Sequence, residues 1–187
     1  MGTKGEKTRS DIIACAKNLF YQRGYDATSF SDIVDASGLY RGNIYHYFKT
    51  KDEILGAVVD QYLTELRLLT AQWSAKYVTP KERMLAFVGM VAGNPELMNY
   101  GCPIGSLNME LGKERRELQL AARALFDCFR DWLAEQLLAL GYGDEANAMA
   151  IHLLGRAEGI SVMVQVYQDK KLLEREAQGL ADWVRQL

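Results

Sequence analysis

Apolar residues recur every three or four positions along most of this chain, and this spacing restricts the fold more than any other feature. Between residues 8 and 23, for example, Ile12, Ala16, Leu19 and Phe20 fall on one stripe, as on a helix with one buried face. An alternation of apolar and polar residues, which a half-buried strand would require, persists nowhere. The 187 residues include only three prolines, which rarely occur inside helices. The sequence therefore predicts an all-α fold.

Glycines and capping residues divide the chain into separate helices. Gly24 is the expected stop of the first helix, and either Thr28 or Ser29 can cap the second, which Gly38 ends. Thr50 then caps a long helix. We expect helices at about residues 8–23, 30–37, 41–48, 52–76, 81–92, 104–111, 115–140, 145–167 and 171–186.

Charge is distributed unevenly along the chain, although its net value is only −2. Residues 1–51 contain eight Lys or Arg and five Asp or Glu, whereas residues 52–187 contain fourteen and nineteen. The N-terminal part is therefore basic and the remainder acidic. This distribution favours a polyanion as the partner of the N-terminal part alone.

Composition and cysteine content indicate a cytoplasmic protein. Apolar residues make up 49% of the chain and charged residues 25%, as in ordinary soluble globular proteins. Cys15, Cys102 and Cys128 are scattered and odd in number, which argues against a disulfide framework and for a reducing compartment. No apolar run approaches 18 residues, so we expect no membrane-spanning helix.

The stretch from Gly38 to Glu53, GLYRGNIYHYFKTKDE, combines a dense aromatic cluster with basic residues. Two short helices joined by a tight turn at Gly38, after a longer supporting helix, form the helix-turn-helix pattern. In the second short helix, Ile44, Tyr47 and Phe48 repeat at three-to-four spacing and should face the core. The opposite face then carries five side chains, which are Tyr40, Arg41, Asn43, Tyr45 and His46.

This outward face suits DNA on physical grounds. Tyrosine hydroxyls and helix N-terminal N–H groups bind phosphates, while Arg41 and Asn43 can read base edges in the major groove. Gly42 has no side chain and permits close approach of the backbone. Lys49 and Lys51 adjoin the N-terminus of the next helix and form a second expected phosphate site. The alternative is that the aromatic residues are simply core.

Residues 28–55, TSFSDIVDASGLYRGNIYHYFKTKDEIL, closely resemble the DNA-binding domain of the TetR/AcrR family of bacterial repressors. Members of that family end their recognition helix in a Tyr-x-Tyr/His-Phe run followed by a Lys-led cap, as IYHYFKTKDEIL does. The resemblance is close over about residues 8–56, and the length and helix order fit the remainder. It implies a three-helix DNA-binding domain over residues 1–51 and a helical ligand-binding and dimerisation domain over residues 52–187.

The function that the resemblance implies is that of a homodimeric repressor released from DNA by a small-molecule inducer. Two recognition helices would enter successive major grooves, about 34 Å apart, on a palindromic double-stranded operator. Family members often have Ser or Thr where this chain has Tyr40, and Thr where it has Asn43, so kinship does not predict the operator sequence. The expected DNA contacts, carried over by position and with Gly42 added because it lacks a side chain, are Thr28, Ser29, Tyr40, Arg41, Gly42, Asn43, Tyr45, His46 and Lys51.

Residues 145–167 are apolar over most of the helix circumference and include small residues such as Gly155 and Gly159. A helix that is apolar on two faces must be covered on both. A second copy of the chain is a natural cover, and the resemblance implies that the last two long helices build a four-helix dimer interface. The alternative is a monomeric bundle with this helix at its centre.

An adaptable apolar pocket is expected in the body, because aromatic and methionine side chains are common there and suit such cavities. Each of them can equally be ordinary core. Their chemistry favours an apolar or aromatic ligand. The candidate lining residues are Tyr62, Leu66, Trp73, Phe87, Met90, Met98, Tyr100, Cys102, Leu107, Phe126, Phe129, Met163 and Tyr167.

Cys102 stands apart because it lies in a segment rich in glycine and proline, just before an expected short helix. A helix N-terminus stabilises a thiolate, and some TetR-family sensors respond to electrophiles through a cysteine in the corresponding region. One hypothesis is therefore that Cys102 senses a reactive molecule. The other is that it is a buried structural cysteine.

An enzymatic function is not expected. The two histidines, His46 and His152, lie in different modules, and neither a Gly-rich phosphate loop nor a metal-ligand spacing occurs. We therefore expect no catalytic site, cofactor or metal. The remaining alternative to a ligand-responsive DNA-binding regulator is a helical interaction module without sequence-specific DNA binding, which would lack a steep salt dependence of duplex binding.

Overall fold

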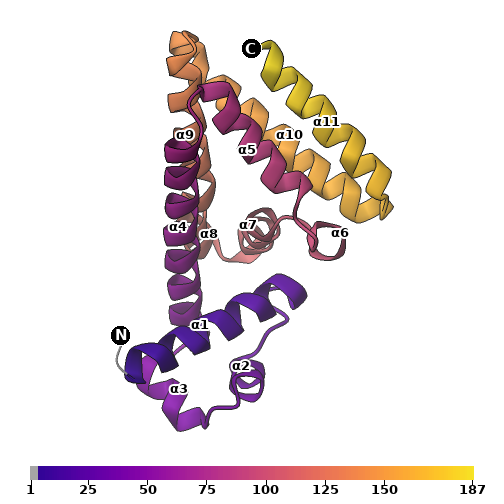
Figure 1. Cartoon of the computed structure of the whole chain (residues 1–187). Coiled ribbons are helices and arrows are strands. Elements are labelled where there is room, and N and C mark those ends of the chain that lie inside the picture. Colours follow the sequence, from indigo (N-terminus) through magenta and orange to yellow (C-terminus); the bar gives the residue numbers. More distant parts are fainter. Residues whose placement is uncertain (1–3) are drawn as a thin grey trace. The chain divides into compact units, whose positions relative to one another are not determined.

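The computed structural model describes residues 4–187, and residues 1–3 of the expected first domain lie outside the described residues. All regular structure in the described part is helical (Figure 1). The elements in chain order are α1 (Lys4–Arg23), α2 (Phe30–Ser37), α3 (Arg41–Tyr47), α4 (Lys51–Lys76), α5 (Pro80–Ala92), α6 (Leu97–Tyr100), α7 (Pro103–Glu114), α8 (Arg116–Ala122), α9 (Ala124–Ala139), the 3-10 turn η1 (Gly143–Glu145), α10 (Ala146–Tyr167) and α11 (Lys170–Gln186).

The chain forms two compact units, and each contains two segments of the sequence. The first unit extends to Thr64 and adds Ser106–Ala124, while the second consists of Glu65–Gly105 and Leu125–Leu187. This division differs from the expected boundary after residue 51. The physical reason is that α4 continues without a break past that point and buries its first turns, at Ile54, Leu55 and Val58, in the first unit.

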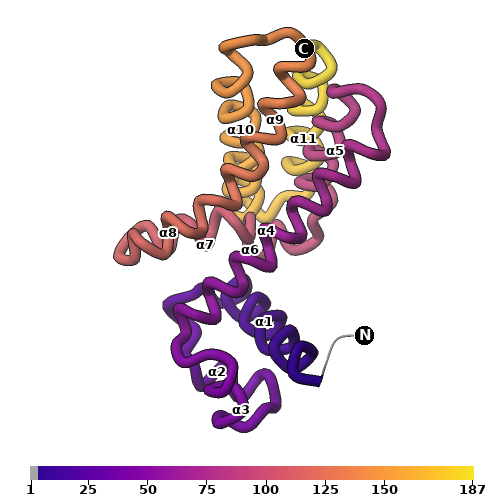
Figure 2. The backbone as a smooth tube through the Cα atoms, turned by 90° about the vertical axis from the view of Figure 1, so that its left-hand side faces the viewer, coloured from indigo at the N-terminus to yellow at the C-terminus, as the bar shows by residue number. Residues whose placement is uncertain are grey.

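The first unit is built around the stripe that the sequence predicts on α1. Ile12, Ala16 and Phe20 are buried there, and so are Ile33 of α2 and Ile44 of α3. In both Figures 1 and 2, α2 and α3 lie together on one side of α1. Helices α2 and α3 have only eight and seven residues, so their stability depends on this packing, because isolated helices of that length are marginal in water.

The second unit packs α11 against α5 and α10, and these helices run side by side in Figure 1. Helix α11 buries Leu173, Ala177, Leu180 and Val184 at three-to-four spacing, as expected for a helix with one apolar face. A cluster of aromatic rings fills the interior of this unit: the ring centroids of Trp73 are 5.4 Å from Trp132 and 6.5 Å from Phe129, and Phe87 is 5.2 Å from Phe129.

Two stretches differ from the sequence expectation. The single helix expected at residues 115–140 is divided into α8 and α9 at Arg123. The glycine- and proline-rich segment before residue 104 contains the short helix α6, which ends at Gly101 with φ 72°. No helix within residues 4–187 combines the length and the apolar character that crossing a membrane requires.

Candidate DNA-binding surface

Helix α2 begins with a complete capping box. The backbone N–H of Asp32 donates to Oγ of Ser29 at 3.1 Å, and the backbone N–H of Ser29 donates to Oδ2 of Asp32 at 2.6 Å. Hydrogen bonding from the Ser29 side chain and from its backbone N–H lowers the pKa of the Asp32 carboxyl group. Of the two caps that the sequence allows, the structure has Ser29 in this role.

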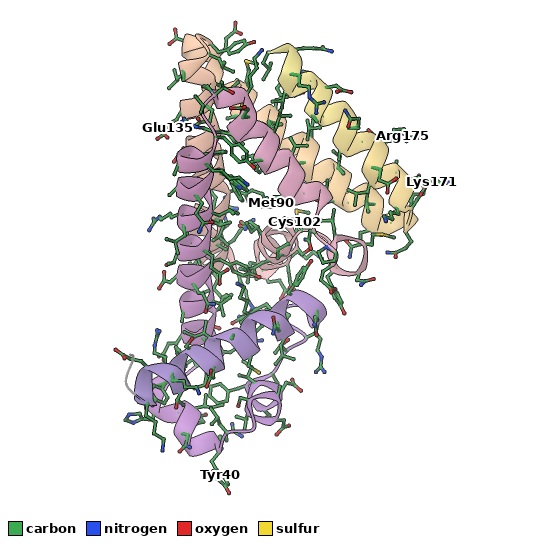
Figure 3. The ribbon with its side chains drawn as sticks, in the orientation of Figure 1. Tyr40, Met90, Cys102, Glu135, Lys171 and Arg175 are labelled. Carbon is green, nitrogen blue, oxygen red and sulfur yellow. The ribbon has the colours of Figure 1, made fainter. Side chains whose placement is uncertain are left out.

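The turn after α2 requires a left-handed residue, which Gly38 supplies with φ 66° and ψ 13°. Tyr40 then occupies the N-cap of α3 without a side-chain capping bond. Its side chain is 85% exposed and points away from the helices in Figure 3. A tyrosine in this position keeps its hydroxyl available for a phosphate.

Helix α3 has one buried face and, opposite it, one exposed outer face. Ile44 and Phe48 are buried, whereas Tyr47 is only half-buried. The exposed positions are six of those that the sequence assigns to DNA, namely Tyr40, Arg41, Gly42, Asn43, Tyr45 and His46. Ser29, a seventh, is exposed at the start of α2.

Aromatic rings support the Arg41 side chain. Its Cζ lies 5.8 Å from the ring centroid of Phe30 and 5.6 Å from that of Tyr45, within the range of cation–π attraction. The two rings also contact each other, with centroids 4.9 Å apart. These contacts hold the guanidinium near the start of α3, on the same exposed face as Asn43.

The Thr28 side chain does not have the exposed position that a DNA contact requires. Its side chain is fully buried, and its hydroxyl donates to the backbone carbonyl of Gly24 at 2.7 Å. A side chain without solvent exposure cannot reach a phosphate, so Thr28 stabilises the α1–α2 connection instead. This role could not be predicted from the sequence, because threonine at an N-terminal boundary is equally typical of a cap.

The Lys51 side chain also makes its contacts inside the protein. Its Nζ donates to the carbonyl oxygens of Tyr25 at 2.7 Å and Thr28 at 2.8 Å, and lies 4.0 Å from the centroid of the Tyr25 ring. Burial lowers the pKa of this ammonium group. Two of its three donors are therefore used inside the protein, which leaves at most one for the expected phosphate contact.

The expected pocket residues are distributed over both units and differ in their exposure. Tyr62 and Leu107 belong to the first unit, while Met163 and Tyr167 are exposed on α10. Within the second unit, Leu66, Phe87 and Phe129 are buried core, and four residues are only partly buried, namely Met98, Tyr100, Cys102 and Phe126.

Trp73 and Met90 are the two candidates that line an open groove between α4 and α5, of about 580 Å³. Figure 3 labels Met90 on α5. Ala86 and Gly89, three positions apart on α5, leave the space for this groove, and a Cβ added at Gly89 would meet nothing within 4 Å. The sequence reasoning missed the other lining residues, which are Leu69, Tyr77, Glu82, Leu85, Ala86 and Gly89. The small residues Ala86 and Gly89, three positions apart, were the sequence feature that could have indicated this groove.

The surroundings of Cys102 disfavour deprotonation of its thiol, which a reactive sensor would need. Burial and the nearby Glu158 carboxyl group raise the pKa of the thiol to about 12. Sγ does accept the backbone N–H of Gly105 at 3.4 Å, as expected at a helix start, but the effect of burial is larger. The thiol is therefore protonated at neutral pH and is a poor nucleophile.

Two short helices joined by a tight turn, the second with a polar and aromatic outer face, are typical of helix-turn-helix DNA-binding proteins. The sequence model for bacterial regulatory proteins of the tetR family matches residues 12–58, and that for the LmrA/YxaF-like transcriptional regulator C-terminal domain matches residues 80–178. The chain belongs to the TetR family of transcriptional regulators. Its family places it among regulators and not among enzymes.

Two curated relatives and one solved structure are similar to this chain over most of its length. An HTH-type transcriptional regulator from the lacX 3′ region of Lactococcus lactis subsp. lactis is 28% identical over 173 residues, which cover 89% of this chain and 88% of the relative. An HTH-type transcriptional repressor of Mycobacterium tuberculosis is 35% identical over 128 residues, or 68% of this chain and 65% of the relative. A TetR transcriptional regulator of Chloroflexus aurantiacus superposes with a TM-score of 0.84 at 27% identity, covering 98% and 96% of the two chains.

Proposed function

We propose that this protein is a cytoplasmic transcriptional repressor that binds a palindromic operator as a homodimer and leaves it when a small apolar or aromatic molecule binds. The observation that carries the proposal is the outer face of α3, where Arg41, Asn43 and His46 are exposed above a buried Ile44. Arginine and asparagine are the side chains that best pair with guanine and adenine edges. The relative from Mycobacterium tuberculosis that is named a repressor supports repression as the direction of regulation.

An exposed apolar face on α10 supports the homodimer. Large apolar side chains there are exposed by about half or more, namely Ile151, Val162, Met163, Val166 and Tyr167. A Cβ added at Gly155 or Gly159 would meet nothing within 4 Å, so a helix from a second copy could approach this face closely. Exposed apolar patches of this kind mark interaction surfaces.

The lining of the groove between α4 and α5 supports an apolar or aromatic ligand. Leu69, Trp73, Leu85 and Met90 supply apolar and adaptable walls. Glu82 lies at its edge, but its carboxylate already accepts the backbone N–H and the hydroxyl of Thr79, both at 2.9 Å. An uncharged or weakly polar aromatic molecule therefore fits better than one that needs this carboxylate. We do not propose a reactive inducer, because the Cys102 thiol is protonated.

Selection of duplexes from a random-sequence library by the wild-type protein would test this function. We expect an enriched sequence with two-fold symmetry, and a linear fall of log K with log salt, whose slope of about −0.9 per neutralised phosphate reports the phosphate contacts. No enrichment together with no salt dependence would instead support a helical interaction module without sequence-specific DNA binding.

A further inference from the structure

The loop between α1 and α2 is held by a carboxylate that comes from α7, 84 positions or more along the chain. Oε2 of Glu110 accepts the backbone N–H of Tyr25 at 2.8 Å, and Oε1 accepts that of Asp26, also at 2.8 Å. One carboxylate thus binds two successive N–H groups of the loop. The fit requires glycine just before them, since a Cβ at Gly24 would lie 2.9 Å from Oε1 of Glu110, and φ is +88° there.

A second residue from the same part of the chain strengthens this contact. Nε of Arg115 donates to Oδ1 of Asp26 at 2.9 Å, and its Cζ lies 5.3 Å from the centroid of the Tyr25 ring. The Tyr25 ring is fully buried and has Lys51 within 4.0 Å of its centroid. The hydroxyl of Tyr25 donates to Asp52 at the start of α4. Glu110 and Arg115 together will be called the loop clamp.

The helix that carries Glu110 is itself well fixed in the first unit. Asn108 of α7 is buried and donates from Nδ2 to the carbonyl of Ala122 in α8 at 3.3 Å. Nε2 of Gln119 in α8 donates back to the carbonyl of Asn108 at 3.1 Å. Leu107 and Leu111, on either side of Glu110, are buried. The carboxylate therefore comes from a packed helical pair and not from a free surface turn.

The loop leads directly into the helix-turn-helix. It leads within three residues of Asp26 to Ser29, the N-cap of α2, and the next helix is the DNA-reading α3. Helix α7 begins in the second unit at Pro103 and continues into the first unit as an unbroken helix to Glu114. The helix that carries Glu110 thus has residues in both units.

We propose that Glu110 is a positioning residue for DNA binding, which sets the α1–α2 loop and thereby α2 and α3 for the operator. The proposal rests on the proposed function, since it assumes operator binding. Glu110 is not itself proposed as a DNA contact, because both of its carboxylate oxygens accept N–H groups of the loop. Its removal should lower operator affinity without removing a phosphate contact, and this pair of effects separates it from the residues of the outer face.

The test is Glu110→Gln, with Glu114→Gln as its matched control. Glutamine presents one acceptor and one N–H₂ group to two N–H donors, so it cannot make both bonds. Glu114 is an exposed residue of the same helix, and its variant makes the same change of charge. Glu110→Asp keeps both acceptors at a shorter reach and should restore part of the function.

Two readouts are needed, and the first requires no DNA. Amide hydrogen exchange at Tyr25 and Asp26, followed by NMR in the full-length protein, should become at least about tenfold faster in Glu110→Gln, because local opening becomes easier. The second is affinity for a duplex selected by the wild-type protein, which should fall at least about fivefold. The slope of log K against log salt should stay the same, since no phosphate contact is lost.

Unchanged exchange at both amides would refute the clamp, whether or not the protein binds DNA. Faster exchange with unchanged affinity would refute the positioning role. A change in the salt slope would also overturn it and would indicate a direct DNA contact. If the wild-type protein selected no duplex, the proposed function would fail, and the positioning role would fail with it, whereas the clamp would still be decided by exchange.

Discussion

Arg41 and Asn43 are the side chains on which sequence reading by this protein should depend. Arg41 is preorganised by the rings of Phe30 and Tyr45, and exposed contacts of this type contribute about 0.5–1 kcal/mol. Asn43 is exposed on the same helix, one residue before the buried Ile44. Both can therefore reach a groove edge while the underside of α3 stays packed.

Replacing Arg41 or Asn43 by alanine should change which base pairs the protein prefers. Each lost bidentate contact should reduce discrimination at one position by about 1–3 kcal/mol. Tyr40→Phe is the control, because it removes only a hydroxyl expected at a phosphate and should weaken all duplexes alike. The measurement is competition binding against single-base variants of the selected duplex. Equal losses on every duplex for all three proteins would remove the assignment of Arg41 and Asn43 to bases.

At the scale of elements, the N-terminal cap of α2 stabilises the first helix of the helix-turn-helix. Eight residues cannot hold a helix by propensity alone, so the capping box of Ser29 and Asp32 and the buried Ile33 must stabilise it. The pKa of Asp32 is lowered by its bonds with Ser29. A depressed carboxyl pKa means that this stabilisation is present above the unfolded-state pKa and is lost as the pH falls.

Ser29→Ala should reduce the free energy of unfolding by about 1 kcal/mol, the usual effect of removing an N-cap side chain. The control is Ser31→Ala, an exposed serine inside the same helix that does not cap it. Urea denaturation at neutral pH measures both. Moving the measurement to acidic pH should shrink the difference between wild type and Ser29→Ala, because Asp32 becomes protonated. A difference that grew on acidification would contradict the capping account.

At the scale of the whole molecule, the apolar face of α10 should join two copies of the chain. We expect a solution mass of about twice the chain mass of 21.1 kDa, because a C₂ dimer is the commonest closed assembly. Val162→Glu should yield the monomer, since it places a charge in the buried interface. The control Leu68→Glu changes a residue of similar exposure, 59% against 55%, on α4 and should remain dimeric.

Light scattering coupled to size-exclusion chromatography gives the mass of each variant directly. The monomeric variant should also lose most of its operator affinity, because two half-sites must then be bound separately. A wild-type protein that ran as a monomer at micromolar concentration would refute the homodimer. Equal behaviour of the two variants would show that the interface lies elsewhere.

The sequence by itself determined most of the helices, the helix-turn-helix and the face of α3 that is exposed. These features depend on periodicity and on capping residues within a few positions of one another, so Ile44 and Arg41 could be assigned to opposite faces from spacing alone. The resemblance of residues 28–55 to the TetR family was equally local, and the family models confirm it.

Only the tertiary structure decided what Thr28, Lys51, Cys102 and Glu110 do. The Thr28 hydroxyl faces Gly24, Lys51 caps two carbonyls 23 and 26 positions earlier, and Glu110 binds a loop 84 positions or more away. Burial reverses the pKa shift expected for Cys102. Polar side chains of these types can face water or protein with equal ease in a linear sequence. Their partners exist only after distant segments pack together, and packing therefore determined their roles.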